Sequence, residues 1–142
     1  MKKITLARPT FGDETIDAVS EVLRSGNLVQ GEHVETFEQK LCDYTGAQFA
    51  VAMNSATSGL YASLISCGVK AGDEVIVPAL SYIATANVVE MLGAIPVFCD
   101  IASDGFNIDC EKLSTCLSSR TKAVLAVHEF GEPLNIEFLL SF

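Results

Sequence analysis

The sequence contains no tryptophan, few basic residues and no apolar run long enough to cross a bilayer. Nine Lys and Arg residues stand against eighteen Asp and Glu residues, which gives a net charge of −9. Nucleic-acid-binding proteins usually carry a basic patch, and none is visible here. No apolar run approaches the roughly 18–20 residues of a membrane span, and residues 1–9 turn polar too soon for a signal peptide. We therefore expect a cytoplasmic, acidic globular protein with no nucleic-acid or membrane partner.

The cysteine pattern gives no sign of a zinc site or a disulfide framework. There is no Cys-x-x-Cys pair, and His33 and His128 lie far apart in the sequence. An odd number of cysteines in apolar or helical contexts favours buried free thiols over disulfides. The five residues are Cys42, Cys67, Cys99, Cys110 and Cys116. We predict no metal site.

The apolar residues predict an α/β fold with a mostly parallel sheet flanked by helices. Helical spacing appears over 13–25 and 32–44, each followed by a glycine. Short apolar runs then alternate with helical stretches, which is typical of parallel sheets with both faces covered. The predicted strands are 49–53, 74–77, 95–99 and 123–127, and the predicted helices are 57–67, 84–92 and 109–117. Residues 135–142 look like the start of another helix without a stop signal, so the chain looks cut short.

Three segments follow predicted strands, where parallel sheets bind their ligands. They span 54–59, 78–82 and 128–133. The first is a small, hydroxyl-rich turn that opens a helix, and unpaired amides at a helix start suit a phosphate. An ordinary helix N-cap would use the same residue types, so both interpretations remain open locally. The turn carries neither a G-x-G-x-x-G fingerprint nor a Walker G-K-[ST] ending.

Two further side chains lie at these strand ends. Tyr82 is compatible with stacking on a planar ring and also with ordinary packing. His128 is compatible with an acid–base role and also with a structural, half-buried role. Local sequence alone favours the structural interpretation for both residues.

Seven short motifs follow one another along almost the whole chain. They are SGNLVQG at 25–31 (followed by Phe37 and Glu38), NSATSGL at 54–60, GDEVIVP at 72–78, ATAN at 84–87, GAIPVF at 93–98, RTKA at 120–123, and Val127-His128 with Gly131 and Pro133. In this order and spacing, the chain resembles the N-terminal part of the DegT/DnrJ/StrS-type sugar aminotransferases. These are pyridoxal 5'-phosphate (PLP) enzymes of the aspartate-aminotransferase fold, known as fold type I.

The resemblance implies a fold and a cofactor site. Residues 1–142 would form an N-terminal segment and an incomplete large PLP-binding domain, without the rest of that domain or the small C-terminal domain. The strand at 49–53 would not lie beside the next three. Thr57 and Ser58 would bind the PLP phosphate, and Tyr82 would stack on the pyridine ring. Asn87 matches a family asparagine near the site.

The resemblance also implies an activity. Family members form homodimers and transfer an amino group, usually from glutamate, to a nucleotide-linked keto-sugar, for surface polysaccharide, lipopolysaccharide or antibiotic pathways. Their Schiff-base lysine and the aspartate that pairs with the pyridine nitrogen lie downstream of the region matching Pro133, so no catalytic residue is assigned here. This chain alone would then be inactive. One alternative is a catalytically inactive remnant or an interaction module completed by another chain. Another is an unrelated nucleotide-binding α/β protein.

Overall fold

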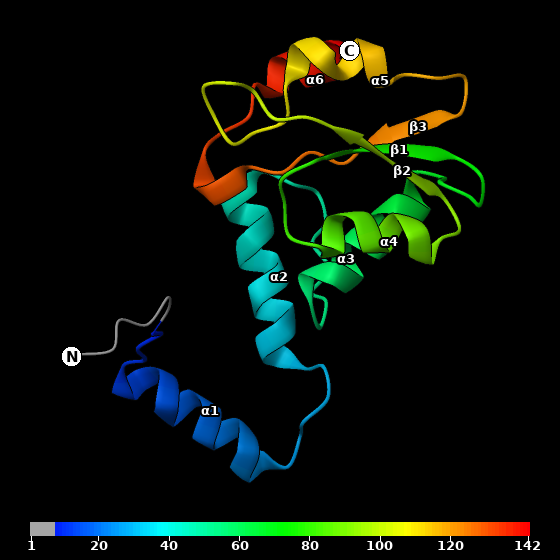
Figure 1. The fold of residues 1–142 in the computed structure, drawn as a ribbon. Coiled ribbons are helices and arrows are strands. Elements are labelled where there is room, and N and C mark those ends of the chain that lie inside the picture. The colour runs from blue at the N-terminus through cyan, green and yellow to red at the C-terminus, as the bar shows by residue number, and fades with distance from the viewer. Residues whose placement is uncertain (1–7) are drawn as a thin grey trace, which may run out of the picture. The chain divides into compact units, whose positions relative to one another are not determined.

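The computed structural model describes residues 8–142, which form two compact units that meet in sequence between Ala52 and Met53 (Figure 1). Each unit is described by itself. No helix within the described residues is long and apolar enough to cross a membrane.

The first unit contains two helices whose bounds follow their capping residues. Helix α1 spans Asp13–Ser25 and helix α2 spans Glu32–Thr45, as the sequence predicts to within one residue. Both begin with acidic residues, which suit the positive end of the helix dipole. Both end at a glycine with a left-handed backbone, Gly26 at φ 71° and Gly46 at φ 75°. Neither helix has a buried residue, so their apolar faces remain exposed.

The second unit is built on a three-stranded parallel sheet. Its strands are β1 (Glu74–Pro78), β2 (Ile95–Cys99) and β3 (Thr121–Val124), in the spatial order β2-β1-β3. The strand predicted over 123–127 begins and ends earlier in the structure, at Thr121 and Val124, because these residues bound its pairing with β1. The helices of this unit are α3 (Ala56–Ser66), α4 (Ala84–Met91), α5 (Leu113–Cys116) and α6 (Ile136–Ser141).

Two apolar clusters cover the two faces of the sheet, and β1 is buried along its whole length because it contributes to both. Val75 and Val77 pack with Val88 of α4 on one face. Ile76, whose side chain points the opposite way, packs with Leu113 of α5 on the other. In Figure 1, α3 and α4 accordingly lie on one side of the sheet, and α5 and α6 on the other. This layering confirms the predicted α/β class.

The predicted strand over 49–53 is wrong: the structure assigns no strand there. Phe49 and Val51 are 78% and 75% exposed, respectively. A strand needs a hydrogen-bonded neighbour, and these residues pair with none among the described residues. Their apolar pattern is that of a buried strand, but the side chains of Phe49 and Val51 are not covered by anything between residues 8 and 142.

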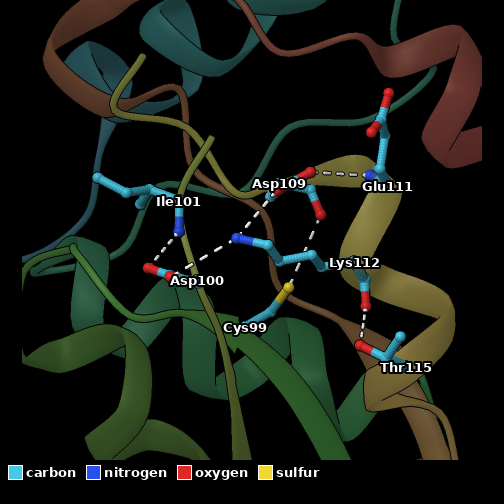
Figure 2. Close-up of polar contacts among 7 residues, drawn as sticks. All are labelled: Cys99, Asp100, Ile101, Asp109, Glu111, Lys112 and Thr115. Carbon is cyan, nitrogen blue, oxygen red and sulfur yellow. Dashed lines mark hydrogen bonds and ion pairs between the residues drawn. The ribbon is translucent and has the colours of Figure 1, made fainter. Parts of the chain in front are cut away.

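The predicted helix over 109–117 is also shorter than expected. It begins with a 3₁₀ turn at Cys110–Lys112, because the Asp109 carboxylate accepts a hydrogen bond from the amide of Glu111 at 3.0 Å. Figure 2 shows the polar contacts around this turn. The ammonium of Lys112 lies between Asp109 (3.2 Å) and Asp100 (3.6 Å), which links the turn to the end of β2.

All five cysteines are free thiols, and they differ in burial. Cys99 is buried and donates from Sγ to the carbonyl oxygen of Asp109 at 3.7 Å (Figure 2). Cys67 is exposed, so the expectation of burial is wrong there. It is the C-cap of α3 and lies outside both apolar clusters.

Candidate functional site

The carboxyl ends of β1 and β3 and the start of α3 meet at one cavity of about 590 Å³ in the second unit. Its walls include Thr57 from the start of α3, Tyr82 from the loop after β1, and His128 from the segment after β3. A cavity of this size is typical of small-molecule and cofactor sites. The structure therefore brings together the three segments that the sequence marks as strand ends.

The hydroxyl residues of the turn before α3 have different surroundings. Ser55 is the N-cap, and its Oγ accepts a hydrogen bond from the amide of Ser58 at 3.1 Å. The hydroxyl of Ser58 donates to Asn54 Oδ1 at 2.7 Å. Ser58 does not line the cavity, whereas Thr57 does. The N-cap interpretation is thus confirmed for Ser55, and Thr57 is the hydroxyl residue of the turn that lines the cavity.

The first amides of α3 are available to an anion. The amide of Ser58 is bonded to Ser55 Oγ and that of Gly59 to the Ser55 carbonyl, whereas Ala56 and Thr57 donate to nothing within residues 8–142. Unlike α1 and α2, α3 has no acidic residue in its first turn. No carboxylate of its own therefore competes for these amides.

A second helix begins at the same cavity. Ala84 and Thr85, the first two residues of α4, also line it, and this helix too has no acidic residue in its first turn. The hydroxyl of buried Thr85 lies 3.0 Å from that of Ser81, which also lines the cavity. The positive ends of two helix dipoles therefore meet at a cavity whose lining contains no lysine or arginine and one carboxylate, that of Glu129.

Tyr82 lies on the rim of the cavity with 76% of its surface exposed. This exposure does not fit burial in the core, whereas packing at the rim and stacking on a planar ring both stay predictions. Its ring is available to contact a flat ligand, and aromatic rings favour offset or edge contacts with other rings.

The third wall is formed by His128 and Glu129. The amide of Leu134 donates to His128 Nδ1 at 3.0 Å, so the neutral imidazole carries its proton on Nε2. Glu129 Oε2 is buried and has no hydrogen-bond partner within residues 8–142. The sequence marked this segment as a strand end but gave no signal for Glu129, whose place in the wall depends on the turn that carries it.

Two other candidates lie outside this cavity. Asn87 is exposed on α4 and is not part of the lining. The loop over 27–31 belongs to the first unit, where it borders a separate cavity of about 460 Å³ with Val22 and His33.

The donor set of the second-unit cavity fits a phosphorylated aromatic ligand such as PLP. Free amides and the Thr57 side chain suit a phosphate, and Tyr82 offers a ring face. No described lysine lines the cavity, so its residues offer no amine for a covalent bond to an aldehyde. No group of three or more metal-binding side chains occurs in the described part of the chain.

Solved structures with the same architecture include sugar-modifying enzymes. The sugar aminotransferase Spr1654 of Streptococcus pneumoniae matches 98% of this chain with a TM-score of 0.92 and 34% identity. DesV of S. venezuelae, solved with a ketimine intermediate, matches 91% with a TM-score of 0.86 and 35% identity. The GDP-4-keto-6-deoxy-D-mannose-3-dehydratase of E. coli, solved with hydrated PLP, matches 99% with a TM-score of 0.89 and 30% identity.

The chain spans about 35%, 35% and 38% of the length of these three relatives, respectively. The fold is therefore the N-terminal part of a PLP-dependent transferase, as the motifs imply. PLP-bound forms are found among these relatives, consistent with a PLP-dependent family. The family model described as the DegT/DnrJ/EryC1/StrS aminotransferase family matches residues 9–141, and the chain belongs to this family.

Proposed function

We propose that residues 53–142 form the phosphate end of a PLP site in an aminotransferase that acts on a nucleotide-linked keto-sugar. The observation that carries the proposal is the pair of helix starts, at Thr57 and Thr85, that line one cavity with no acidic residue in either first turn. The free amides and hydroxyl of Thr57 would hold the phosphate, and Tyr82 would contact the ring. PLP supplies an electron sink when it is bound.

Ser58 has a more indirect role in this proposal. Its amide and hydroxyl are already bonded to Ser55 and Asn54, so it would keep the turn in shape and hold Thr57 toward the cavity. This differs from the expectation that Ser58 itself binds the phosphate. The difference is testable, because Ser58→Ala would then alter the turn without removing a phosphate contact.

Family membership and the solved relatives support the choice of reaction. The amino acceptor would be a nucleotide-linked keto-sugar and the donor glutamate, and the full enzyme would act as a homodimer in the cytoplasm. A second candidate is removal of a sugar hydroxyl, since the GDP-4-keto-6-deoxy-D-mannose-3-dehydratase of E. coli has 30% identity and the same fold. The two reactions differ in their products, an amino sugar or a deoxy sugar.

A chimera tests this proposal in a complete enzyme. The present chain would replace the matching segment of the Streptococcus pneumoniae aminotransferase, of which it covers 35%. We expect the chimera to retain PLP through dialysis and to transfer the amino group of glutamate to a keto-sugar nucleotide. A folded chimera that loses PLP would overturn the proposal. If the chimera does not fold, titration of the present chain with PLP and with inorganic phosphate decides the same point.

A further inference from the structure

The turn that forms the third wall of the cavity has an unusual backbone. It is a 3₁₀ turn over Glu129–Gly131 in which Phe130 has φ 52° and ψ 21°. Gly131 follows with φ 83°. A bulky residue rarely adopts the left-handed region, and such a conformation persists only where its surroundings impose it. Phe130 is the only non-glycine residue with a positive φ among residues 8–142.

Asn107 holds this turn from a distant part of the chain. Its Oδ1 accepts a hydrogen bond from the amide of Glu129 at 2.9 Å, and its Nδ2 donates to the carbonyl of Glu132 at 3.0 Å. The two bonds bracket Phe130 and Gly131. Both bonds require a side-chain amide, which offers one acceptor and one donor. One partner is an N–H and the other a carbonyl, and this fixes which end of the Asn107 amide is oxygen. Asn107 itself does not line the cavity.

The side chains of the turn need this backbone anchor. Glu129 Oε2 has no hydrogen-bond partner in the described part of the chain, so the place of this carboxylate is set by the backbone that carries it. Phe130 is 77% exposed and contacts Phe106, the neighbour of Asn107, edge to face at 5.1 Å between ring centroids. The segment 106–107 thus contributes both polar and aromatic contacts that hold the turn.

We propose that Asn107 is a positioning residue of the cofactor cavity: its two hydrogen bonds fix the turn that places His128 and Glu129 in the cavity wall. The inference rests on the proposed function, because the wall matters only if a cofactor occupies the cavity. It predicts that loss of the Asn107 hydrogen bonds lowers the affinity for the ring end of the ligand. The affinity of the α3 start for phosphate should stay the same.

The test compares three variants of the present chain. Asn107→Ala removes both bonds, and Asn107→Asp keeps the acceptor and removes the donor. Ser118→Ala is the matched control, because its hydroxyl bonds Glu74 Oε2 at 2.5 Å and does not line the cavity. Each variant is measured for the dissociation constants of PLP and inorganic phosphate, for amide hydrogen exchange and for urea unfolding.

We expect Asn107→Ala to weaken PLP binding about fivefold to tenfold, the scale of one or two hydrogen bonds, with Asn107→Asp intermediate. Inorganic phosphate should bind all variants equally. The amides of Glu129, Glu132 and Leu134 should exchange faster in Asn107→Ala, whereas Ser118→Ala should leave both exchange there and PLP binding unchanged.

Two outcomes would overturn the inference. One is an unchanged PLP affinity in Asn107→Ala. The other is an equal loss of PLP and phosphate affinity that follows the urea midpoint in Asn107→Ala and Ser118→Ala alike, since that would indicate general destabilisation. If the unaltered chain binds neither ligand, the proposed function has failed. The exchange of the three turn amides then reports separately on whether the two hydrogen bonds of Asn107 hold the turn.

Discussion

Arg120 donates from Nε to Glu74 Oε1 at 2.9 Å, and its guanidinium also contacts the same oxygen through Nη2. The pair links the loop before β3 to the first residue of β1. Ser118 Oγ donates to the other oxygen of this carboxylate. Only 8% of the Glu74 side chain is exposed, whereas the Arg120 side chain is 63% exposed. The Glu74 carboxylate therefore depends on Arg120 to compensate its charge, whereas the exposed guanidinium can be solvated by water.

Replacing the arginine should destabilise the second unit. Arg120→Leu leaves the enclosed carboxylate with only the Ser118 hydroxyl as a partner, and an enclosed charge without compensation is costly. We expect a lower urea midpoint than in the unaltered chain, followed by circular dichroism. Arg24→Leu, on exposed helix α1, is the control and should have little effect. Equal midpoints for both variants would contradict this role of the pair.

The same pair predicts an acid-sensitive unit. Hydrogen bonds from Ser118 and Arg120 lower the pKa of Glu74 from its ordinary value of 4.5, and a hydrogen bond from Lys112 lowers the pKa of Asp109. A carboxyl group with a lowered folded-state pKa stabilises the fold above its unfolded-state pKa. That contribution is lost as the pH falls through the folded-state pKa. We expect the urea midpoint to fall as the pH drops below about 4.5, and Arg120→Leu to flatten this dependence. An unchanged slope in Arg120→Leu would contradict the assignment to Glu74.

The cysteines should react in an order set by their burial. Burial, with a further contribution from a hydrogen bond to Cys116, raises the pKa of Cys99 to about 12. Since the thiolate is the reactive form, iodoacetamide at pH 8 should label exposed Cys67 first and Cys99 last, as read by peptide mass spectrometry. The raised pKa also means that the stability contributed by Cys99 is present below about pH 8.5 and is lost as the pH rises toward 12. Early labelling of Cys99 in native buffer would contradict this order, because it would show that the apolar cluster of Cys99 with Ile76 and Leu113 opens readily.

The two ends of the proposed cofactor site should be separable by mutation. Thr57→Val should weaken binding of both PLP and inorganic phosphate by about 1–3 kcal/mol, the scale of a hydrogen bond to a charged group. Tyr82→Ala should weaken PLP binding by about 0.5–1.5 kcal/mol beyond the loss of contact area, and leave phosphate binding unchanged. Thr115→Val and Tyr44→Ala are matched controls outside the cavity. The roles fail if these variants and their controls bind PLP equally, as measured by equilibrium dialysis.

Much of the fold could be predicted because local and nonlocal signals agree in it. The run Glu74–Val77 is apolar on both faces after its first residue, and the structure buries it completely as β1. Helix α1 begins and ends where acidic residues and Gly26 predict. The segment 49–53 carries an equally apolar pattern but no strand, because pairing depends on partners that a local pattern does not specify.

The candidate site was predictable only in part, for a similar reason. Tyr82 lies in the loop after β1, where sequence position alone places it near the cavity. Thr57 lines the cavity at the start of α3, although the segment before it, 49–53, is not the predicted strand. The different role of Ser58 depends on side-chain hydrogen bonds within the turn. The part played by Asn107 depends on contacts across 22 and 25 residues, which no periodicity reveals.

A titration of the ¹⁵N-labelled chain with inorganic phosphate and with PLP, followed by amide chemical shifts, tests most directly whether α3 opens a phosphate site. We expect saturable shifts at Ala56 and Thr57 with both ligands, and shifts at Tyr82 with PLP alone. The amides at the start of α1, next to Asp13 and Glu14, are an internal control and should not move. Equal shifts at α1 and α3, or none at Ala56 and Thr57, would contradict the claim that α3 opens a phosphate site.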